Sequence, residues 1–302
     1  MFRGGRRMEG FPYDPRDALR LLRGLPGDVR LHEPLCRHTT FRIGGPAWCF
    51  FVPRERSAFV EAISRARAEG IPWFVLGGGS NVLFPDEGFP GLVIATKGLR
   101  SLEPDGPRIF AEAGVPLPAL VSRGFPALAG IPGTVGGAVV MNAGTRAGSI
   151  SRHVLAVEVL GHDGLLHRIP AAECGFSYRS SRLKRLHLPV VGVELAAPVD
   201  EGPSAAELLR RRRGSQPVGL PSAGCVFRNP PDAPPAGWLI DRAGFKGARL
   251  GDALVSPVHA NFICNLGRAR ASDVLSLIER IREGVRSLFG VLLEPEIEIV
   301  WT

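Results

Sequence analysis

The stretch VLGGGSNVLF, residues 75–84, places three consecutive glycines directly after a run that reads as a short strand. A dinucleotide fingerprint, G-x-G-x-x-G, would need glycine where the chain has Val82, and a P-loop would need a lysine that this stretch lacks. The glycines nevertheless allow positive φ angles and close approach of the backbone to a ligand, and successive N–H groups in such a turn bind anions. Ser80 and Asn81 add further donors.

A second glycine-rich stretch, GIPGTVGGAVVMNAG at residues 130–144, offers the same chemistry. Gly133, Gly136 and Gly137 bring the backbone close to a neighbour, and Thr134 adds a hydroxyl group. Two interpretations stay open from the glycines alone. The simpler is two tight turns packed on each other, and the alternative is a pair of loops that clamps one large phosphorylated ligand.

The composition excludes several classes of protein. The 302 residues are enough for two or three lobes, and 45% apolar with 22% charged residues is ordinary for a globular protein. No apolar run reaches the roughly 18 residues of a membrane span, and the basic N-terminus lacks the apolar segment of a secretory signal. Five cysteines without a C-x-x-C pair favour a reducing cytoplasm, and the histidine spacing predicts no metal site.

The net charge of +8 is compatible with nucleic acid, an anionic surface or anionic small ligands. Its densest run is Arg210–Arg213, which we interpret as a solvated helix end. The chain has no basic stripe interleaved with aromatic residues, so nucleic-acid binding is a minor alternative.

Local patterns predict a β-α-β-like start followed by a strand-rich middle and a helical end. The predicted helices are 54–69, 117–123 and a long one whose apolar residues recur at helical spacing up to Gly290. The predicted strands are 73–76, 92–95, short strands within 99–113, 154–160, 165–169, 190–195 and a final strand at 292–301. The polar segment 198–204 is a predicted lobe boundary.

Seven motifs in a fixed order carry more information than any one of them. They are HTTFRIGGPA (38–47), VLGGGSNVLF (75–84), GIPGTVGGAVVMNAG (130–144), YRSSRLK (178–184), PSAGCVFRNP (221–230), LIDRAGFKGARLGDALVSPVHANFICN (239–265) and LEPEIEIV (293–300). This set resembles the UDP-N-acetylenolpyruvoylglucosamine reductase (MurB) family of peptidoglycan synthesis over residues 31–300. The short length resembles its type II subfamily.

The resemblance implies an α+β architecture. Two lobes would form a vanillyl-alcohol-oxidase (PCMH-like) FAD-binding fold, and a C-terminal α+β domain would bind the UDP-sugar. The expected divisions are an N-terminal extension and helix at 1–30, FAD lobes at 31–95 and 96–200, and the substrate domain at 201–291, with strand 292–302 returning to the first lobe or to the site.

The resemblance also implies the reaction. FAD is bound non-covalently, NADPH reduces it, and hydride then passes to UDP-N-acetylglucosamine enolpyruvate to give UDP-N-acetylmuramate. A cytoplasmic monomer without a nucleic-acid partner is expected. Hydride addition leaves carbanion character beside a carboxylate, which calls for a cation there and a proton donor at the carbon.

By resemblance, Arg179 and Glu296 polarise the carboxylate and Cys225 donates the proton, where the family commonly has serine. Glu296 would do so either as a protonated group or through a proton network, and both alternatives stay open. A thiol with an ordinary pKa of about 8.5 is mostly protonated at neutral pH and is a stronger acid than an alcohol. An exposed thiol of low pKa would also be prone to oxidation. Without the motifs, Arg179 reads as a surface ion pair, Glu296 as a solvated strand face and Cys225 as a small core residue.

The remaining site residues follow from the same resemblance. Those expected at FAD are Arg42, Gly77, Gly78, Gly79, Ser80, Asn81, Ile131, Pro132, Gly133, Thr134, Gly136, Gly137 and Asn142. Those expected at the UDP-sugar are Tyr178, Asn229, Lys246 and Asn261, with Arg213 and Gln216 as weaker candidates.

Two other functions stay open. Another FAD-dependent oxidase on the same fold would share the glycine loops but would not need Arg179, Cys225 and Glu296 together. Many such oxidases attach flavin through His or Cys, which neither loop contains, so non-covalent FAD is favoured. A non-enzymatic nucleotide- or nucleic-acid-binding protein rests only on the positive charge.

Overall fold

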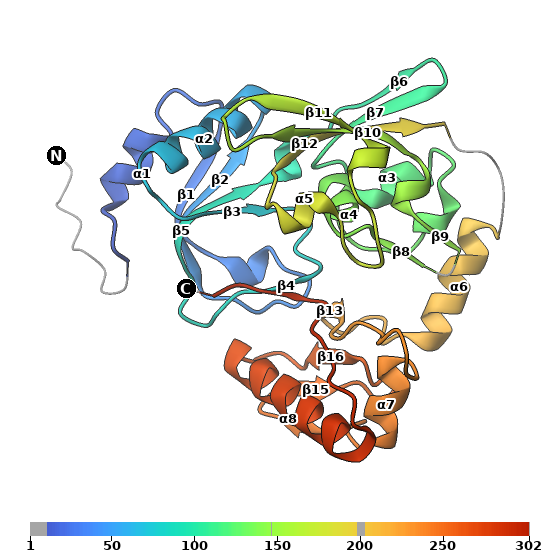
Figure 1. The fold of residues 1–302 in the computed structure, drawn as a ribbon. Coiled ribbons are helices and arrows are strands. Elements are labelled where there is room, and N and C mark those ends of the chain that lie inside the picture. Colours follow the sequence, from blue (N-terminus) through green and yellow to red (C-terminus); the bar gives the residue numbers. More distant parts are fainter. Residues whose placement is uncertain (1–10, 146, 198–202, 302) are drawn as a thin grey trace.

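The computed structural model describes residues 11–145, 147–197 and 203–301, which form three main sheets (Figure 1). Residues 1–10 of the predicted N-terminal extension, and residues 198–202 of the predicted lobe boundary, lie outside the described residues. The expected divisions at 31–95, 96–200 and 201–291 remain predictions.

The first sheet has the strand order β1-β2-β5-β3, with the β2–β5 and β3–β5 pairs parallel. The helix α2 connects β2 to β3. It packs on this sheet through a buried face that includes Ala58, Phe59 and Ile63. The elements are α1 (Pro15–Leu21), β1 (Gly27–Pro34), β2 (Pro46–Pro53), α2 (Arg56–Ala68), β3 (Trp73–Leu76) and β5 (Phe89–Ala95).

The second sheet is antiparallel, in the order β11-β10-β12-β7-β6, and short helices cover it. Its strands are β6 (Leu102–Asp105), β7 (Arg108–Glu112), β10 (Val154–Leu160), β11 (Leu166–Pro170) and β12 (Val190–Ala196). Around it lie α3 (Leu117–Val121), α4 (Val135–Val140), α5 (Arg182–Arg185) and the small hairpin β8 (Gly144–Thr145) and β9 (Gly148–Ser149).

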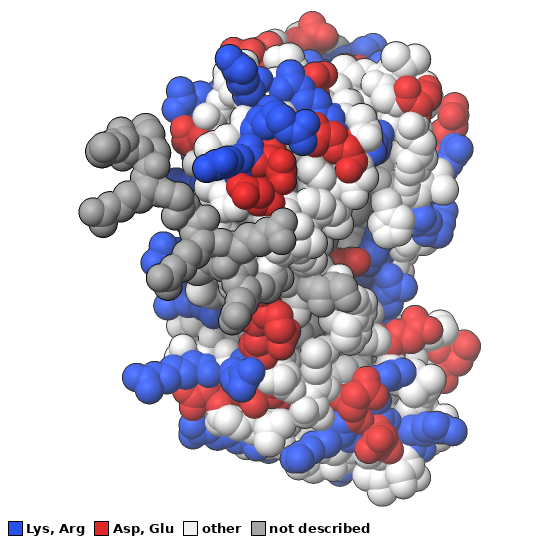
Figure 2. All heavy atoms as spheres, turned by 90° about the vertical axis from the view of Figure 1, so that its left-hand side faces the viewer, with Lys and Arg blue, Asp and Glu red and all other residues white. Residues whose placement is uncertain are grey.

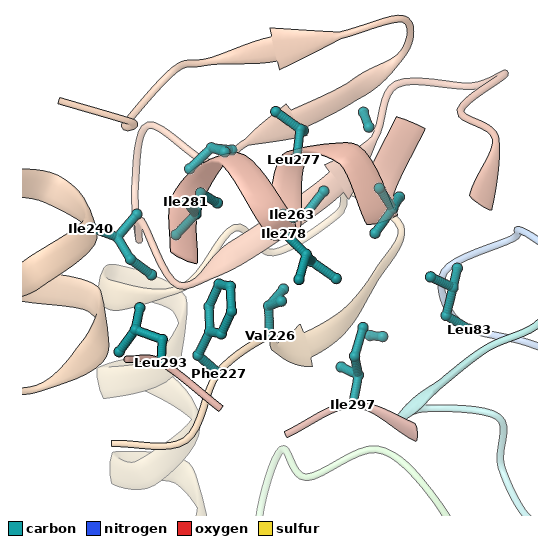
Figure 3. Packing of buried hydrophobic residues seen from close by; sticks show 14 of the residues in the cluster. Leu83, Val226, Phe227, Ile240, Ile263, Leu277, Ile278, Ile281, Leu293 and Ile297 are labelled. Atoms are coloured by element: carbon teal, nitrogen blue, oxygen red, sulfur yellow. The ribbon is translucent and has the colours of Figure 1, made fainter. Parts of the chain in front are cut away.

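The third sheet has the order β13-β16-β15-β14 and packs against the long helix α8 (Ala271–Phe289). Figure 3 shows Leu277, Ile278 and Ile281 of α8 packed with Val226 and Phe227 in this core. The other elements are α6 (Ala205–Ser215), β13 (Ser222–Cys225), α7 (Ala236–Arg242), β14 (Arg249–Leu250), β15 (Ala253–Val255) and β16 (Phe262–Asn265).

The C-terminal segment joins the third sheet to the first glycine loop. Its strand β17 (Glu298–Ile299) pairs in parallel with β4 (Val82–Leu83), directly after that loop. Leu83 and Ile297 thereby enter the core of α8 (Figure 3). The predicted ten-residue strand at 292–301 is wrong in length, because the segment contacts two neighbours in turn: Pro295 bridges to Phe227 before β17 reaches β4.

Two other local predictions differ in outcome. The predicted helix at 54–69 is confirmed as α2, and the periodic apolar residues before Gly290 form α8, which ends at that glycine with φ 69°. Residues 135–140, interpreted as part of a glycine loop, instead form the helix α4. Packing requires Gly136, because a Cβ there would lie 2.8 Å from the Cβ of Ala113.

On the face seen in Figure 2, basic and acidic side chains are interspersed. Among residues 11–145, 147–197 and 203–301, no helix combines the length and the apolar character needed to cross a membrane.

Asp86 fastens the first half of the molecule to the start of α8. Its carboxylate accepts hydrogen bonds from the backbone N–H of Ala271 and Ser272, at 2.8 and 3.1 Å, and from the Ser272 hydroxyl. Burial would raise the pKa of Asp86, but these hydrogen bonds outweigh burial and hold the pKa below its usual range. The carboxylate of Asp86 therefore acts as an N-terminal cap of α8, although Asp86 lies in a distant segment of the chain.

We expect Asp86→Ala to lower the free energy of unfolding by about 1 kcal/mol, because it leaves the first amides of α8 unpaired. The pKa of Asp86 is depressed in the folded state, so its contribution is present at neutral pH and is lost as the pH falls through that pKa. Urea unfolding at pH 7 and at pH 3 would measure this difference. Glu87→Ala, on the exposed neighbour, is the control, and an equal loss in both variants would contradict the capping role.

Candidate active site

A cavity of about 1260 Å³ opens where the three sheets meet. The two glycine stretches, the end of β13 and the C-terminal segment all contribute to its lining. Arg179, Cys225 and Glu296, which are far apart in the sequence, line this one cavity. It therefore brings together the three residues expected to carry the chemistry.

The two glycine loops touch each other at the wall of the cavity. A Cβ on Gly78 would lie 2.6 Å from the Cα of Gly133, so no side chain fits between the two backbones. Gly79 has φ 61° and packs against the backbone of His38 and Thr39. The Ser80 hydroxyl donates to the carbonyl of Pro132 at 3.1 Å and holds the loops together. The turns are thus packed on each other, as the simpler interpretation expects. They also border a large cavity, and the clamping of a phosphorylated ligand stays a prediction.

The residues present fit a large phosphorylated cofactor such as FAD. The Thr134 hydroxyl oxygen is buried and has no hydrogen-bond partner among the described residues, although it lies at the cavity wall. Bare glycine backbone beside it leaves room for diphosphate oxygens. Of the residues expected at FAD, these line the cavity: Gly77, Gly78, Gly79, Ser80, Asn81, Ile131, Pro132, Gly133, Thr134, Gly136 and Gly137.

The other two residues expected at FAD, Arg42 and Asn142, are not among the residues that line the cavity. Arg42 is exposed in a turn with φ 55°, and its carbonyl accepts from the amide of Asn265. Asn142 is buried, and its side-chain amide donates to the carbonyl of Ser177 at 2.9 Å. Asn142 thus contacts the base of the turn that presents Arg179.

Arg179 is held by a strained turn and an ion pair. It has φ 53° between Ser177 and Ser180, whose backbones bridge each other. Its Nε lies 2.8 Å from Oε1 of Glu296. Glu296 is fixed in turn because its backbone N–H donates to Val226 at 2.7 Å, next to Cys225. The pair is mostly buried, with 25% and 12% of the two side chains exposed.

Burial raises the pKa of Glu296 above its usual range, and the neighbouring Arg179 opposes that shift without cancelling it. The carboxyl group is thereby biased toward its neutral form more than an ordinary glutamate. A neutral carboxyl group can donate a hydrogen bond to another carboxylate, which an ionised one cannot do.

This bias has a measurable effect on stability. Since the pKa of Glu296 is raised in the folded state, that state holds a proton that the unfolded chain has released, so stability falls as the pH rises from the unfolded pKa through the folded one. We expect Glu296→Gln to flatten this part of the profile of unfolding free energy against pH. Glu294→Gln is a control on the exposed neighbour two residues away. A profile for Glu296→Gln parallel to that of the unchanged protein would contradict the raised pKa.

The surroundings of Cys225 favour its protonated thiol more strongly than the ordinary pKa of a thiol implies. Burial, followed by the negative charge of Glu296, raises the pKa of Cys225 to about 12, against the opposing charges of Arg179 and Arg212. The thiol is therefore protonated at all physiological pH values. The expected liability to oxidation as a thiolate is accordingly not supported by its surroundings.

The cavity also contains charged residues that the sequence did not single out. Arg212 belongs to the arginine run interpreted as a solvated helix end, but it lines the cavity and donates to the carbonyl of Gly130 at 2.6 Å. Arg228 lines it as well and donates to the carbonyl of Arg179 at 3.2 Å. Lys184 and Glu298 line it and lie 3.4 Å apart. The sequence of four consecutive arginines does not indicate which side chain faces the cavity. Arg212 faces it because α6 packs against the second glycine loop.

The residues expected at the UDP-sugar are not among those lining the cavity, whereas the weaker candidate Gln216 is. The backbone N–H of Phe227 donates to Oδ1 of Asn261, and Nδ2 of Asn261 donates to the carbonyl of Phe227. Asn229 accepts from the first N–H of α7, and Lys246 pairs with Asp241 at 3.1 Å. Tyr178 is 53% exposed beside Arg179. Their roles toward substrate, and that of Arg213, stay predictions.

The comparisons with known proteins agree with these features. Residues 216–300 match the family model described as the UDP-N-acetylenolpyruvoylglucosamine reductase C-terminal domain, and residues 47–170 match an FAD binding domain. A protein of that reductase name from Moorella thermoacetica is 47% identical over 287 residues, which cover 91% of this chain and 94% of that protein. One from Syntrophobacter fumaroxidans is 44% identical and covers 90% and 84% of the two chains.

A solved structure gives the same result in three dimensions. The crystal structure of UDP-N-acetylenolpyruvylglucosamine reductase (MurB) from Thermus caldophilus superimposes with a TM-score of 0.74 at 39% identity, covering 92% of this chain and all of that one. The α+β architecture with an FAD-binding fold is thereby confirmed. With these identities over nine tenths of its length, the chain belongs to the UDP-N-acetylenolpyruvoylglucosamine reductase (MurB) family.

Proposed function

We propose that this protein reduces the enolpyruvyl group of UDP-N-acetylglucosamine enolpyruvate to give UDP-N-acetylmuramate for peptidoglycan synthesis. The observation that carries the proposal is the meeting of Arg179, Cys225 and Glu296 in one cavity bordered by both glycine loops. Relatives that carry this reductase name at 44–47% identity support it. The glycine loops at 77–79 and 133–134 would hold FAD, which would supply the hydride, taken from NADPH, that adds to the distal vinyl carbon of the substrate.

Arg179 and Glu296 bind the substrate carboxylate. The guanidinium offers the planar pair of donors that a carboxylate prefers. Glu296 holds the guanidinium in place at 2.8 Å, and the upward shift of its pKa favours the protonated form, which can donate a hydrogen bond to a carboxylate. Together they stabilise the negative charge that spreads from the neighbouring carbon into the carboxylate after hydride addition.

Cys225 supplies the proton that completes the reaction. The electron pair left on the carbon beside the carboxylate takes the proton from the thiol, the S–H bond breaks, and water returns a proton to the sulfur. Burial keeps the thiol protonated beforehand. The charges of Arg179 and Arg212 favour the transient thiolate, because they oppose the rise in the pKa of Cys225.

An anaerobic spectral titration tests the whole assignment. We expect the purified protein to show flavin absorbance that NADPH bleaches and that UDP-N-acetylglucosamine enolpyruvate then restores. Bleaching without recovery would favour the alternative, another FAD-dependent oxidoreductase on this fold. A protein that remains colourless after incubation with FAD would contradict the assignment.

The cellular setting is part of the proposal. The structure describes all five cysteines and pairs none of them, which supports a reducing cytoplasm. Cell fractionation tests the location. A monomer is also proposed, and light scattering of the purified protein measures its mass.

A further inference from the structure

A second cavity, of about 430 Å³, adjoins the active-site cavity. Gly77, Gly78, Gly133 and Thr134 are among the residues that line both cavities, so the glycine loops form a wall that the two cavities share. This wall consists of backbone, because side chains are excluded where Gly78 meets Gly133. A ligand in the second cavity would therefore touch the same turns as a ligand in the first.

The second cavity is lined by positive charge. Arg37, Lys97 and Arg100 contribute to it, and no Asp or Glu is among the described residues that line it. Glu33, whose charge acts on Lys97, is already paired with Arg30 and His38. Within the described parts of the chain, Lys97 has no carboxylate oxygen within ion-pair distance. The cationic cluster of Arg37, Lys97 and Arg100 is thus not neutralised by the protein.

The surroundings of Lys97 show the consequence of this crowding. Burial lowers the pKa of Lys97 first, and the charge of Arg30 lowers it further, against the partial compensation of Glu33. Its ammonium group lies 5.3 Å from the ring centre of Phe50, whose aromatic face is a weak partner for a cation. A bound anion would relieve this repulsion.

The hydroxyl group of Thr134 borders both cavities and can donate one hydrogen bond, to a ligand in either of them. The Thr134 oxygen is buried, lines the second cavity, and has no hydrogen-bond partner among the described residues. A phosphate oxygen is a suitable acceptor for such a hydroxyl group, and cations with backbone N–H groups commonly complete a phosphate site.

We propose that the FAD-loaded protein binds a phosphate-bearing anion of about the size of pyrophosphate in this second cavity. Arg37, Lys97 and Arg100 provide the charge, and Thr134 provides a hydrogen bond at the shared wall. The anion contacts the turns that hold FAD from the opposite cavity. The inference rests on the proposed function only in placing FAD in the larger cavity.

Calorimetric titration of the FAD-loaded protein with inorganic pyrophosphate tests the site. We expect saturable binding at one site that weakens as salt is added, while the flavin absorbance shows that FAD stays bound. Pyrophosphate that displaces FAD, or that binds only the FAD-free protein, would overturn the proposal because the anion would then occupy the cofactor's own diphosphate position. An absence of binding would overturn it as well.

Two variants and one control assign the binding to the cationic cluster. Lys97→Met keeps most of the side chain and removes the charge, and we expect pyrophosphate binding to weaken about tenfold or more. Arg37→Gln changes an exposed residue, so it tests the same charge with little risk to folding. Arg123→Gln makes the same change of net charge at an exposed position outside both cavities. Equal weakening in all three variants would overturn the site.

This result is independent of turnover. Calorimetry needs no substrate, so pyrophosphate binding stands even if the enolpyruvyl substrate fails to restore the flavin absorbance. A reductase that turns over normally but ignores pyrophosphate would remove the second site and leave the proposed function intact.

Discussion

Replacing the thiol in Cys225→Ala is expected to slow the substrate-dependent recovery of flavin absorbance by about 10²- to 10⁴-fold, the usual contribution of a general acid. Bleaching by NADPH should remain at its normal rate, because that step needs no proton from Cys225. The residue lies at the end of β13 in the cavity, and burial holds the pKa of its thiol at about 12. Rapid-mixing absorbance spectroscopy under anaerobic conditions separates the two half-reactions.

The matched control is Cys225→Ser, which keeps a proton donor of similar size at the same place. We expect it to retain much of the recovery rate. Normal recovery in the alanine variant would exclude Cys225 as the proton donor and leave it as a packing residue. Because the pKa of the thiol is about 12, the donor stays protonated across neutral pH, and the recovery rate should show no loss from this group until the pH approaches that value.

Adding one methyl group in Gly78→Ala is expected to weaken FAD binding by about 10- to 100-fold and to yield a nearly colourless protein. The new Cβ would lie 2.6 Å from the Cα of Gly133, so one of the two loops must move. Such overpacking typically costs about 1–3 kcal/mol, and each 1.4 kcal/mol is roughly a factor of ten in affinity. Backbone cannot move aside as a flexible side chain does, which places the expected effect at the upper end.

Fluorescence titration of the FAD-free protein with FAD measures this loss. Gly214→Ala is the control, because a Cβ there meets nothing within 4 Å and the residue lies in α6. That change should leave FAD affinity unchanged and slightly raise stability, since alanine is the better helix former. Unchanged FAD affinity in Gly78→Ala would show that the contact between the loops does not define the cofactor site.

Much of the local structure could be predicted from neighbouring residues. The apolar spacing before Gly290 predicted α8, and the alanine-rich stretch at 54–69 predicted α2. The alternating residues at 292–301 predicted a long strand, which was wrong. A strand needs a partner of equal length, and β4 offers only two residues. The helix α4 was missed because glycines at 136 and 137 disfavour a helix unless packing requires them.

The order of the seven motifs was enough to determine the family and the FAD-binding fold, and to predict which residues react. Glycine at 77–79 and 133 determined where backbone can approach a ligand, because that depends only on the missing side chain. Only the tertiary structure decided which side chains lie next to one another and how their pKa values shift. Arg179 and Glu296 are 117 residues apart, and their pairing, the raised pKa of Glu296 and the inward turn of Arg212 all follow from burial, which no local pattern encodes.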